Sequence, residues 1–355
     1  MLNVSADYTH YFYQPLQFSS TEGIGIMELP KPKPLRHGDE ASVGVDLRHG
    51  VNEWFAYNMG VHGSIFHSNQ LFWGCDPRIT FQFTPAENHE ISLHAGSYTQ
   101  FFHKAGLTGG GLPTDFFMLA DSTLQAERAV GTSLRYSASF LNKKWTLQAE
   151  GYFKQLYGVV ESLGNIVQLI NQGFDYEKYL ITGAGRNYGL NLMLQRNQGI
   201  ITGYISYSLC WSKRKLPALD GSQEYIYSAS HERRHDLNIV LNARFAKRWT
   251  VGGQFVLASG LPYTKAEEAY ILNGNMICRY STFNGAHMPL YNRLDLSCSC
   301  DIIKTQDHEL GINLSLYNVY CHKNAQFVVY RENLKPIMGT TLSTIIPSIS
   351  IYGKF

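Results

Sequence analysis

The stretch WTLQAEGYFKQ, residues 145–155, alternates apolar and polar side chains along its whole length. One parity carries Trp145, Leu147, Ala149 and Phe153, and the other carries Thr146, Gln148, Glu150, Tyr152 and Lys154. Because successive side chains of a β-strand point to opposite faces, this pattern predicts a strand with one apolar and one polar face. The polar face mixes amides, hydroxyls and opposite charges, which is typical of a hydrated barrel interior rather than of a soluble sandwich.

The same alternation recurs along almost the whole chain and predicts about fourteen strands and no helix. The strands are expected near residues 3–17, 41–49, 54–67, 78–84, 90–101, 126–140, 145–157, 185–196, 200–213, 233–245, 248–261, 292–303, 308–321 and 341–355. Links of about two to five residues alternate with links of about twenty to thirty residues. Since alternate links of an up-and-down sheet lie at the same end, one end has tight turns and the other has large loops. The predicted fold class is therefore all-β, an antiparallel up-and-down transmembrane β-barrel.

The composition excludes several other classes of protein. Charged residues make up 16% of the chain, below the roughly 25% of soluble proteins. No apolar run approaches the roughly 18 residues that a membrane-spanning helix needs. The net charge of +2 gives no field that would attract nucleic acid. The six cysteines lack metal-ligand spacing, so we predict neither a metal nor a cofactor.

Five stretches between residue 78 and the end carry a family resemblance. They are PRITFQFTPAENHEISLHAGSYTQF, LPTDFFMLADSTLQAERAVG, GRNYGLNLMLQRNQGIITGYISYSLCWSKRKLP, ERRHDLNIVLNARFAKRWTVGGQFVLASGLPYT and YNRLDLSCSCDI followed by LGINLSLYNVYCHKN. In order and spacing they resemble the C-terminal part of the TonB-dependent outer-membrane receptors of Bacteroidetes-type bacteria. The resemblance implies a barrel of about 22 strands filled by a plug domain.

The resemblance also implies a function and partners. We expect residues 1–355 to form one transmembrane unit of such a receptor in the outer membrane of a Gram-negative cell, without the plug, the signal peptide and the N-terminal strands. The receptor would import a nutrient such as a glycan, peptide, metal chelate or cofactor. Expected partners are outer-membrane lipid, the barrel assembly machinery, a surface lipoprotein, and a TonB-type energy transducer acting through the missing N-terminal region.

Seven charged residues are predicted to face the lumen. They are Glu150, Lys154, Asp236, Arg244, Arg293, Asp295 and Asp301. Such charges must be paired or solvated, so they either line a substrate path or form a network with plug and water. The motif ERRHD, residues 232–236, is either a ligand-contacting patch or a set of rim charges at a strand start.

The long loops are the expected ligand-contacting elements, above all 158–184 and 262–291, because their aromatic side chains offer stacking surfaces. The proline-rich segment 29–34 is expected to be a stiff spacer. The terminal strand IIPSISIYGKF ends on Phe355, which resembles the aromatic signal that the assembly machinery reads. We predict no enzyme, because there is no Gly-x-Ser-x-Gly motif and because His235 and Asp236 point to opposite faces.

Two alternatives to energised uptake remain open from the residues alone. In the first, the fourteen strands close by themselves into a smaller passive channel, which requires residues 3–18 to pair with 341–355. In the second, the chain forms a barrel that binds or adheres at the cell surface without transport.

Overall fold

The computed structural model describes residues 1–14, 34–106, 115–162, 180–216, 225–246, 248–272, 275–305, 308–330, 335–340 and 344–354. Throughout these residues the regular structure is β-strand, as the sequence predicts. No helix long and apolar enough to cross a membrane occurs in this part of the chain.

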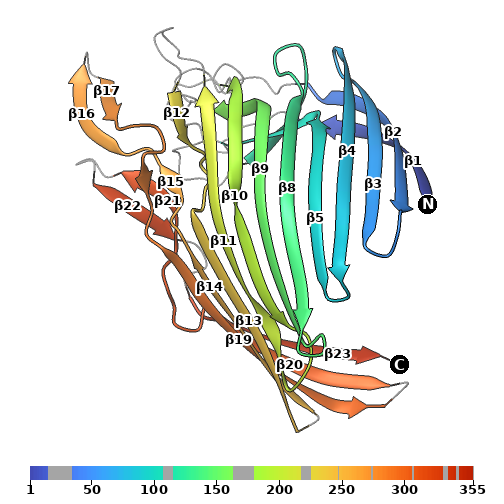
Figure 1. Ribbon diagram of the computed structural model, residues 1–355. Helices are drawn as coiled ribbons and strands as arrows, with labels where there is room; N and C mark the ends of the chain where they lie inside the picture. The colour runs from blue at the N-terminus through green and yellow to red at the C-terminus, as the bar shows by residue number, and fades with distance from the viewer. Residues whose placement is uncertain are drawn as a thin grey trace.

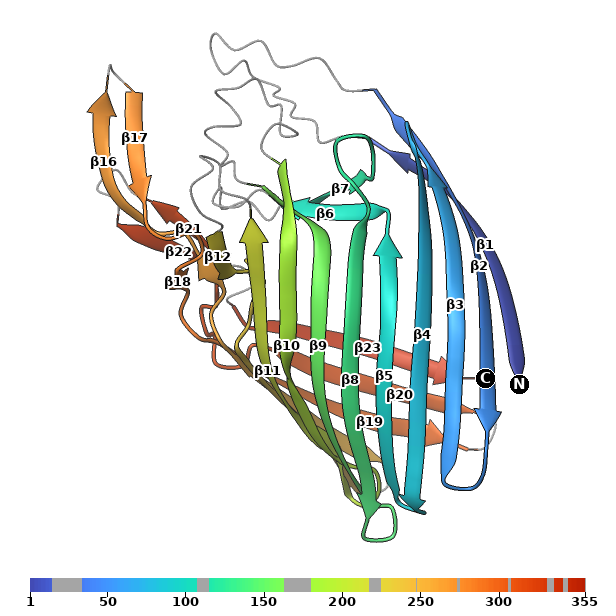
Figure 2. The same cartoon turned by 45° about the horizontal axis from the view of Figure 1, so that its top comes forward.

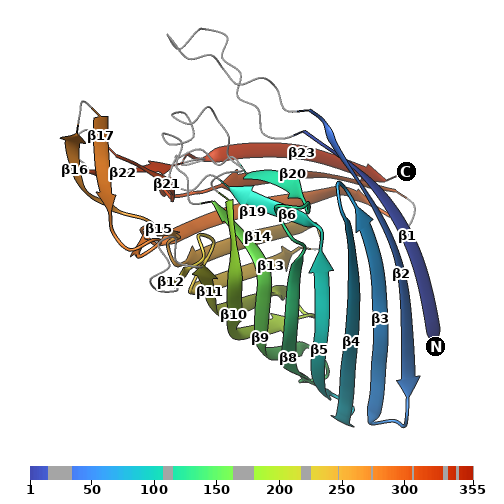
Figure 3. The same ribbon diagram turned by 90° about the horizontal axis from the view of Figure 1, so that it is seen from above.

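Fourteen antiparallel strands follow one another in sequence order through the main sheet, which confirms the expected strand number (Figure 1). They are β1 (Leu2–Tyr13), β2 (Arg36–Gly50), β3 (Phe55–His67), β4 (Leu71–Ala86), β5 (His89–Gln100), β8 (Glu127–Phe140), β9 (Trp145–Ser162), β10 (Leu180–Arg196), β11 (Ile201–Leu216), β13 (His235–Phe245), β14 (Trp249–Ala258), β19 (Tyr291–Lys304), β20 (Glu309–Tyr317) and β23 (Ile346–Lys354). The sheet curls into a deep trough, seen from above in Figure 3, with β1 and β23 at its two edges.

Several strand boundaries differ from the sequence prediction by four to seven residues, and two of these differences have identifiable reasons. The strand expected at 78–84 is β4, which begins at Leu71; Pro77 fits inside it because β4 pairs with β3 there, whereas pairing with β5 starts only at Arg78. The strand expected at 308–321 ends at Tyr317, because Asn318 and Cys321 adopt positive φ angles of 53° and 55°.

The alternation of short and long links breaks at one place. The β3–β4 connection lies at the end of the long loops but contains only Ser68–Gln70. The Ser68 hydroxyl donates a 2.7 Å hydrogen bond to the carbonyl of Ala120, in the segment that returns from the following long link. The short turn thus leaves room for that segment to pack over the sheet.

Several long links carry strands of their own, which the sequence analysis did not predict. These are the pairs β6 (Phe102–Gly106) with β7 (Asp115–Leu119), β15 (Pro262–Tyr263) with β18 (Ala286–His287), β16 (Ala266–Leu272) with β17 (Asn275–Tyr280), and β21 (Ala325–Tyr330) with β22 (Pro336–Thr340), and the strand β12 (Tyr225–Ser228) beside β11. Figure 2 shows β6 and β7 lying across the inside of the trough.

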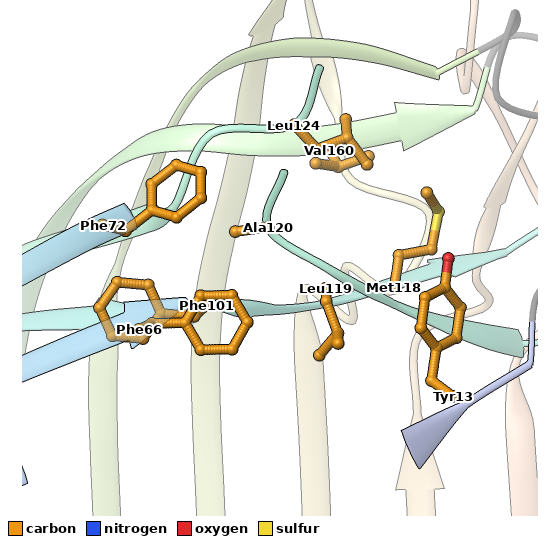
Figure 4. Packing of buried hydrophobic residues seen from close by; sticks show 9 residues of the cluster. All are labelled: Tyr13, Phe66, Phe72, Phe101, Met118, Leu119, Ala120, Leu124 and Val160. Carbon is orange, nitrogen blue, oxygen red and sulfur yellow. The ribbon is translucent and has the colours of Figure 1, made fainter. Parts of the chain in front are cut away.

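An apolar core lies inside the trough, between β7 and the strands β1, β3, β4 and β9, and Figure 4 shows its side chains. Its buried members are Tyr13, Phe66, Phe72, Phe101, Met118, Leu119, Ala120, Leu124 and Val160. The Phe66 and Phe101 rings stack with centroids 5.1 Å apart. A Cβ on Gly38 would lie 2.8 Å from the Phe66 ring and 2.9 Å from Leu119, so only glycine permits this packing. Burial of these side chains anchors the β6–β7 hairpin to the inside of the sheet.

On the opposite, convex face the described residues expose mainly apolar side chains over most of the strand length. Large side chains of alternate residues project from it, for example Trp73 at 77% exposure and Ile351 at 71%. Exposed apolar surface on this scale indicates a face that contacts lipid or another apolar partner.

Candidate functional site on the concave face

Strand register places the seven charged candidates on one face of the sheet, because directly paired residues of neighbouring strands point to the same side. One row of partners runs from Glu150 through Asn191 and Ser208 to Asp236. A second row runs from Lys154 through Asn187 to Ser212. Further along the sheet, Arg244 lies opposite Thr250, Asp295 opposite Gln254 and Arg293 opposite Val256. This is also the face that carries the core beneath β6 and β7.

The three candidates of β19 already have partners within the chain. Arg293 Nε is 2.9 Å from Asp295 Oδ2, and its guanidinium also donates to the hydroxyls of Tyr291 and Tyr317. Asp301 accepts hydrogen bonds from Lys304 at 2.9 Å and from Tyr352 at 2.6 Å. These contacts favour a structural network over a set of free ligand-binding charges in this part of the sheet.

Glu150 and Lys154 line a cavity of about 510 Å³ against the concave side of β5 and β8–β11. Its other polar lining includes His94, Tyr152, Asn187, Asn191, Ser212 and His231. Within the described residues, the side chains of Glu150, Lys154 and Asn191 make no hydrogen bond and no ion pair. The cavity therefore offers an acid, a base and an amide to whatever occupies it.

An ion pair crosses a strand on the same face. The Arg78 guanidinium donates to both carboxylate oxygens of Asp46, at 2.9 and 2.6 Å, and it passes over Gly60 of the intervening strand β3. A Cβ on Gly60 would overlap Asp46 Oδ1, so the Asp46 and Arg78 side chains can meet above β3 only because residue 60 has no side chain. The sequence analysis did not identify this pair, although Asp46, Gly60 and Arg78 share the polar parity of their strands.

The ERRHD motif proves to hold strands together at the end of the long loops. Glu232, only 2% exposed, accepts a 2.7 Å hydrogen bond from the Ser212 amide and a 2.8 Å ion pair from Arg234. Burial alone would raise the pKa of Glu232, but the hydrogen bonds from Arg234 and Ser212 outweigh it and lower that pKa. Arg233 donates to the carbonyl of Ser259 and lies over the Tyr291 ring. Of the two predicted roles, these contacts favour rim charges at a strand start.

Further buried polar side chains surround the outer end of the cavity. Arg214, 5% exposed, donates to Asn187 Oδ1 at 3.0 Å and approaches His231 Nε2 at 3.4 Å and Glu161 Oε1 at 3.9 Å. His103, on β6, is 1% exposed, and neither ring nitrogen has a hydrogen-bond partner among the described residues. Burial lowers the pKa of His103 and that of His231. The sequence analysis did not predict these residues, because only the folded long links bring them together.

Several predicted elements lie wholly or partly outside the described residues. These include Phe355, most of the 29–34 spacer, and residues 163–179 of the 158–184 loop. The 262–291 loop carries β15–β18, with 273–274 outside the described part. Over the residues described, no group of His, Cys, Asp and Glu has an arrangement that could hold a metal ion.

Comparison with known proteins gives the fold a precedent. No family model and no curated protein matches the chain. Among solved structures, the FrpB iron transporter from Neisseria meningitidis matches with a TM-score of 0.63 at 12% identity, over 99% of this chain and 52% of that one. The ferripyoverdine receptor of the outer membrane of Pseudomonas aeruginosa matches with a TM-score of 0.60 at 10% identity, over 99% and 44%.

The chain has the fold of TonB-dependent outer-membrane receptors. The ferric enterobactin receptor of Pseudomonas aeruginosa matches as well, with a TM-score of 0.55 at 10% identity, over 99% of this chain and 50% of the other. The chain thus spans about half the length of the receptors that it matches. The Bacteroidetes type of the sequence resemblance stays a prediction, since these receptors come from Neisseria and Pseudomonas.

Proposed function

We propose that the chain is the barrel part of a TonB-dependent receptor that imports a nutrient ligand across the outer membrane. The single observation that carries this proposal is the division of the sheet into two faces. The convex face exposes apolar side chains, whereas the concave face carries a polar cavity with charges that the described residues leave unpaired. The TonB-receptor fold is consistent with this arrangement.

The cavity supplies the chemistry for a transient contact with a polar ligand or with a segment that fills the lumen. Glu150 can accept hydrogen bonds, Lys154 can donate them, and Asn191 can do both. Because these groups are separate rather than paired with one another, each can exchange water for ligand without breaking a contact of the barrel. The Arg78–Asp46 and Arg293–Asp295 pairs stiffen the surrounding face.

The ligand class and the partners follow from the same proposal. The solved relatives are named for iron, ferripyoverdine and ferric enterobactin, so ferric chelates are the first ligands to test. The proposed partners are a TonB-type transducer, the assembly machinery and a surface lipoprotein. The assembly machinery would read the aromatic side chain of Phe355, and the lipoprotein would dock at the end of the long loops.

The structure bears on the passive-channel alternative. A self-closing barrel requires a ladder between β1 and β23, but these strands are the two ends of the sheet, and their described residues do not pair with each other. Open strand edges cannot face hydrocarbon, since each unpaired backbone group costs several kcal/mol there. We therefore favour a barrel in which other strands cover both edges.

Uptake by cells tests the proposal. A strain that lacks the gene should lose growth on, and uptake of, at least one compound in a panel of ferric chelates, glycans and peptides. Restoring the full-length gene should return uptake, whereas Glu150→Gln with Lys154→Gln should reduce it at an unchanged amount of protein in the outer membrane. The matched control is Glu87→Gln with Lys143→Gln, two exposed side chains in the tight β4–β5 and β8–β9 turns at the other end of the sheet. Unchanged uptake of every compound after deletion would contradict the proposal.

A further inference from the structure

The convex face of β9–β11 has a row of aromatic side chains near the end of the long loops. Phe153, Tyr188 and Trp211 are direct partners across the three strands and therefore lie side by side. The Tyr188 and Trp211 rings stack with centroids 5.3 Å apart, and Phe153 is 43% exposed. Apolar residues continue the same face toward the tight turns, with Leu147, Leu192 and Ile205 as examples.

Cationic side chains occupy the next two rows toward the long loops. In the first row Gln155, Arg186 and Lys213 are direct partners. In the second row Lys215 pairs with Ala184, which pairs with Tyr157, and Tyr157 faces Arg128 of β8. Two residues along a strand span about 7 Å, so the cations begin one such step beyond the aromatic row. We call Arg128, Arg186, Lys213 and Lys215 the basic band.

Neutral partners orient three of these cations. Arg186 Nε donates to Gln155 Oε1 at 2.9 Å, and Gln155 Nε2 is in turn fixed by the carbonyl of Gly185 at 3.0 Å. Arg128 donates to the Ser97 hydroxyl at 3.0 Å, and Lys213 donates to the Ser228 hydroxyl at 2.8 Å.

The described residues provide no carboxylate ion pair for Arg128, Arg186 or Lys213. Glu232 acts on Lys213 electrostatically, but it is buried and makes its own ion pair with Arg234. Hydrogen bonds to neutral groups therefore orient the positive charges of Arg128, Arg186 and Lys213, and these three charges can face an anion.

We propose that the basic band binds the phosphate groups of an anionic lipid in the outer leaflet. This inference rests on the proposed function, which puts the convex face in the membrane. The order of side chains along the strands, apolar, then aromatic, then cationic, matches the order of acyl chain, interface and headgroup in a bilayer. An Arg guanidinium held by its Nε presents its Nη groups as a fork, which suits a phosphate. The chemistry thus selects a phosphate-bearing lipid.

Lipid binding by the full-length gene product, purified in non-ionic detergent, tests the inference. The probe is lipid A that carries its phosphates, compared with the same lipid after their removal, and the dissociation constant is read from native mass spectrometry. Each cation near an anionic membrane surface contributes about fivefold in affinity. We therefore expect Arg186→Gln with Lys213→Gln to weaken binding of the phosphorylated lipid about 25-fold, and to leave binding of the dephosphorylated lipid unchanged.

The matched control is Lys143→Gln with Lys144→Gln, which removes the same two positive charges from the exposed β8–β9 turn at the opposite end of the sheet and should not change lipid affinity. Equal affinity of the wild-type protein for the two lipids would overturn the inference without any variant, even where the double variant fails to fold. Displacement of the lipid by millimolar inorganic phosphate would also overturn it, because the band would then be a site for free phosphate. If the wild-type protein does not insert into bilayers at all, the proposed function itself fails, whereas insertion without phosphate preference defeats this inference alone.

Discussion

Replacing Glu232 by glutamine tests whether the ERRHD motif stabilises the contact between the end of β11 and the segment that precedes β13. The carboxylate accepts three hydrogen bonds, from the Ser212 amide at 2.7 Å, from Arg234 at 2.8 Å and from the Ser228 hydroxyl at 3.2 Å. A glutamine amide has one oxygen, so in either orientation its NH₂ group faces a donor, Ser212 N–H or the Arg234 guanidinium. Loss of a charge-assisted bond at a buried site costs about 3 kcal/mol, which corresponds to roughly a 150-fold change in an opening equilibrium.

Hydrogen exchange followed by mass spectrometry measures that change. In Glu232→Gln, peptides that cover the end of β11 and strand β12 should exchange about 150-fold faster, while β3 and β4 stay as in the wild type. The control is Glu150→Gln, an identical change at a side chain that bonds no described residue. Because the pKa of Glu232 is lowered, the stabilisation is complete above the ordinary glutamate range near 4.5 and is lost as the pH falls through the lower folded value. Exchange at β11 and β12 within twofold of the wild type would refute the structural reading.

Three further predictions follow from the concave face. Gly60→Val should lower the free energy of unfolding in urea by about 1–3 kcal/mol, because the new Cβ would overlap the Asp46 carboxylate. The control is Gly151→Val, where a Cβ would meet nothing within 4 Å. Equal losses of stability in the two variants would contradict the ion pair that crosses Gly60. Leu119→Ala should cost about 2–5 kcal/mol and speed hydrogen exchange of β6–β7, whereas Leu134→Ala on the convex face should not. His103 has a lowered pKa, so burial of the neutral ring stabilises the hairpin above about pH 6.5, and this is lost as the pH falls through the folded value. Hydrogen exchange of β6 and β7 should therefore become faster on acidification, and His103→Leu should abolish this acceleration. Glu127 Oε2 lies 3.9 Å from His103 Nδ1, but this carboxylate does not outweigh the effect of burial on the His103 pKa.

Alternating parity was sufficient to predict the main sheet. It gave the strand number, the antiparallel order and the polar face, because each of these depends on a period of two that the sequence shows directly. The register then confirmed that Glu150, Lys154 and Asp236 share a face. Their role as lumen-lining groups for a ligand stays a prediction.

The alternation of apolar and polar residues could not predict how the long links fold. Residues 102–106 and 115–119 are too short to show a period, and their burial depends on Phe66 and Phe72, which come from distant strands. Phe101, at the end of the strand expected at 90–101, is 2% exposed and packs inside the trough. A residue that reads as a membrane-facing aromatic can equally be a core residue when its link folds inward, and only tertiary contacts separate the two.

Several carboxylates near the outer ends of the strands accept hydrogen bonds from backbone amides, and this role separates them from the residues that could contact a ligand. Where a ladder ends, an acidic side chain takes the place of the next strand: Asp76 accepts the Thr99 amide, Glu232 that of Ser212 and Asp295 that of Asn318, at 2.7–2.9 Å. An unpaired buried N–H is costly, so these acids are committed to the backbone and are poor candidates for ligand contact. Asp295 therefore belongs with the structural acids, although its parity is that of the predicted lumen residues. Glu150 bonds no described amide, which makes it the acidic residue of the candidate set most available to a ligand.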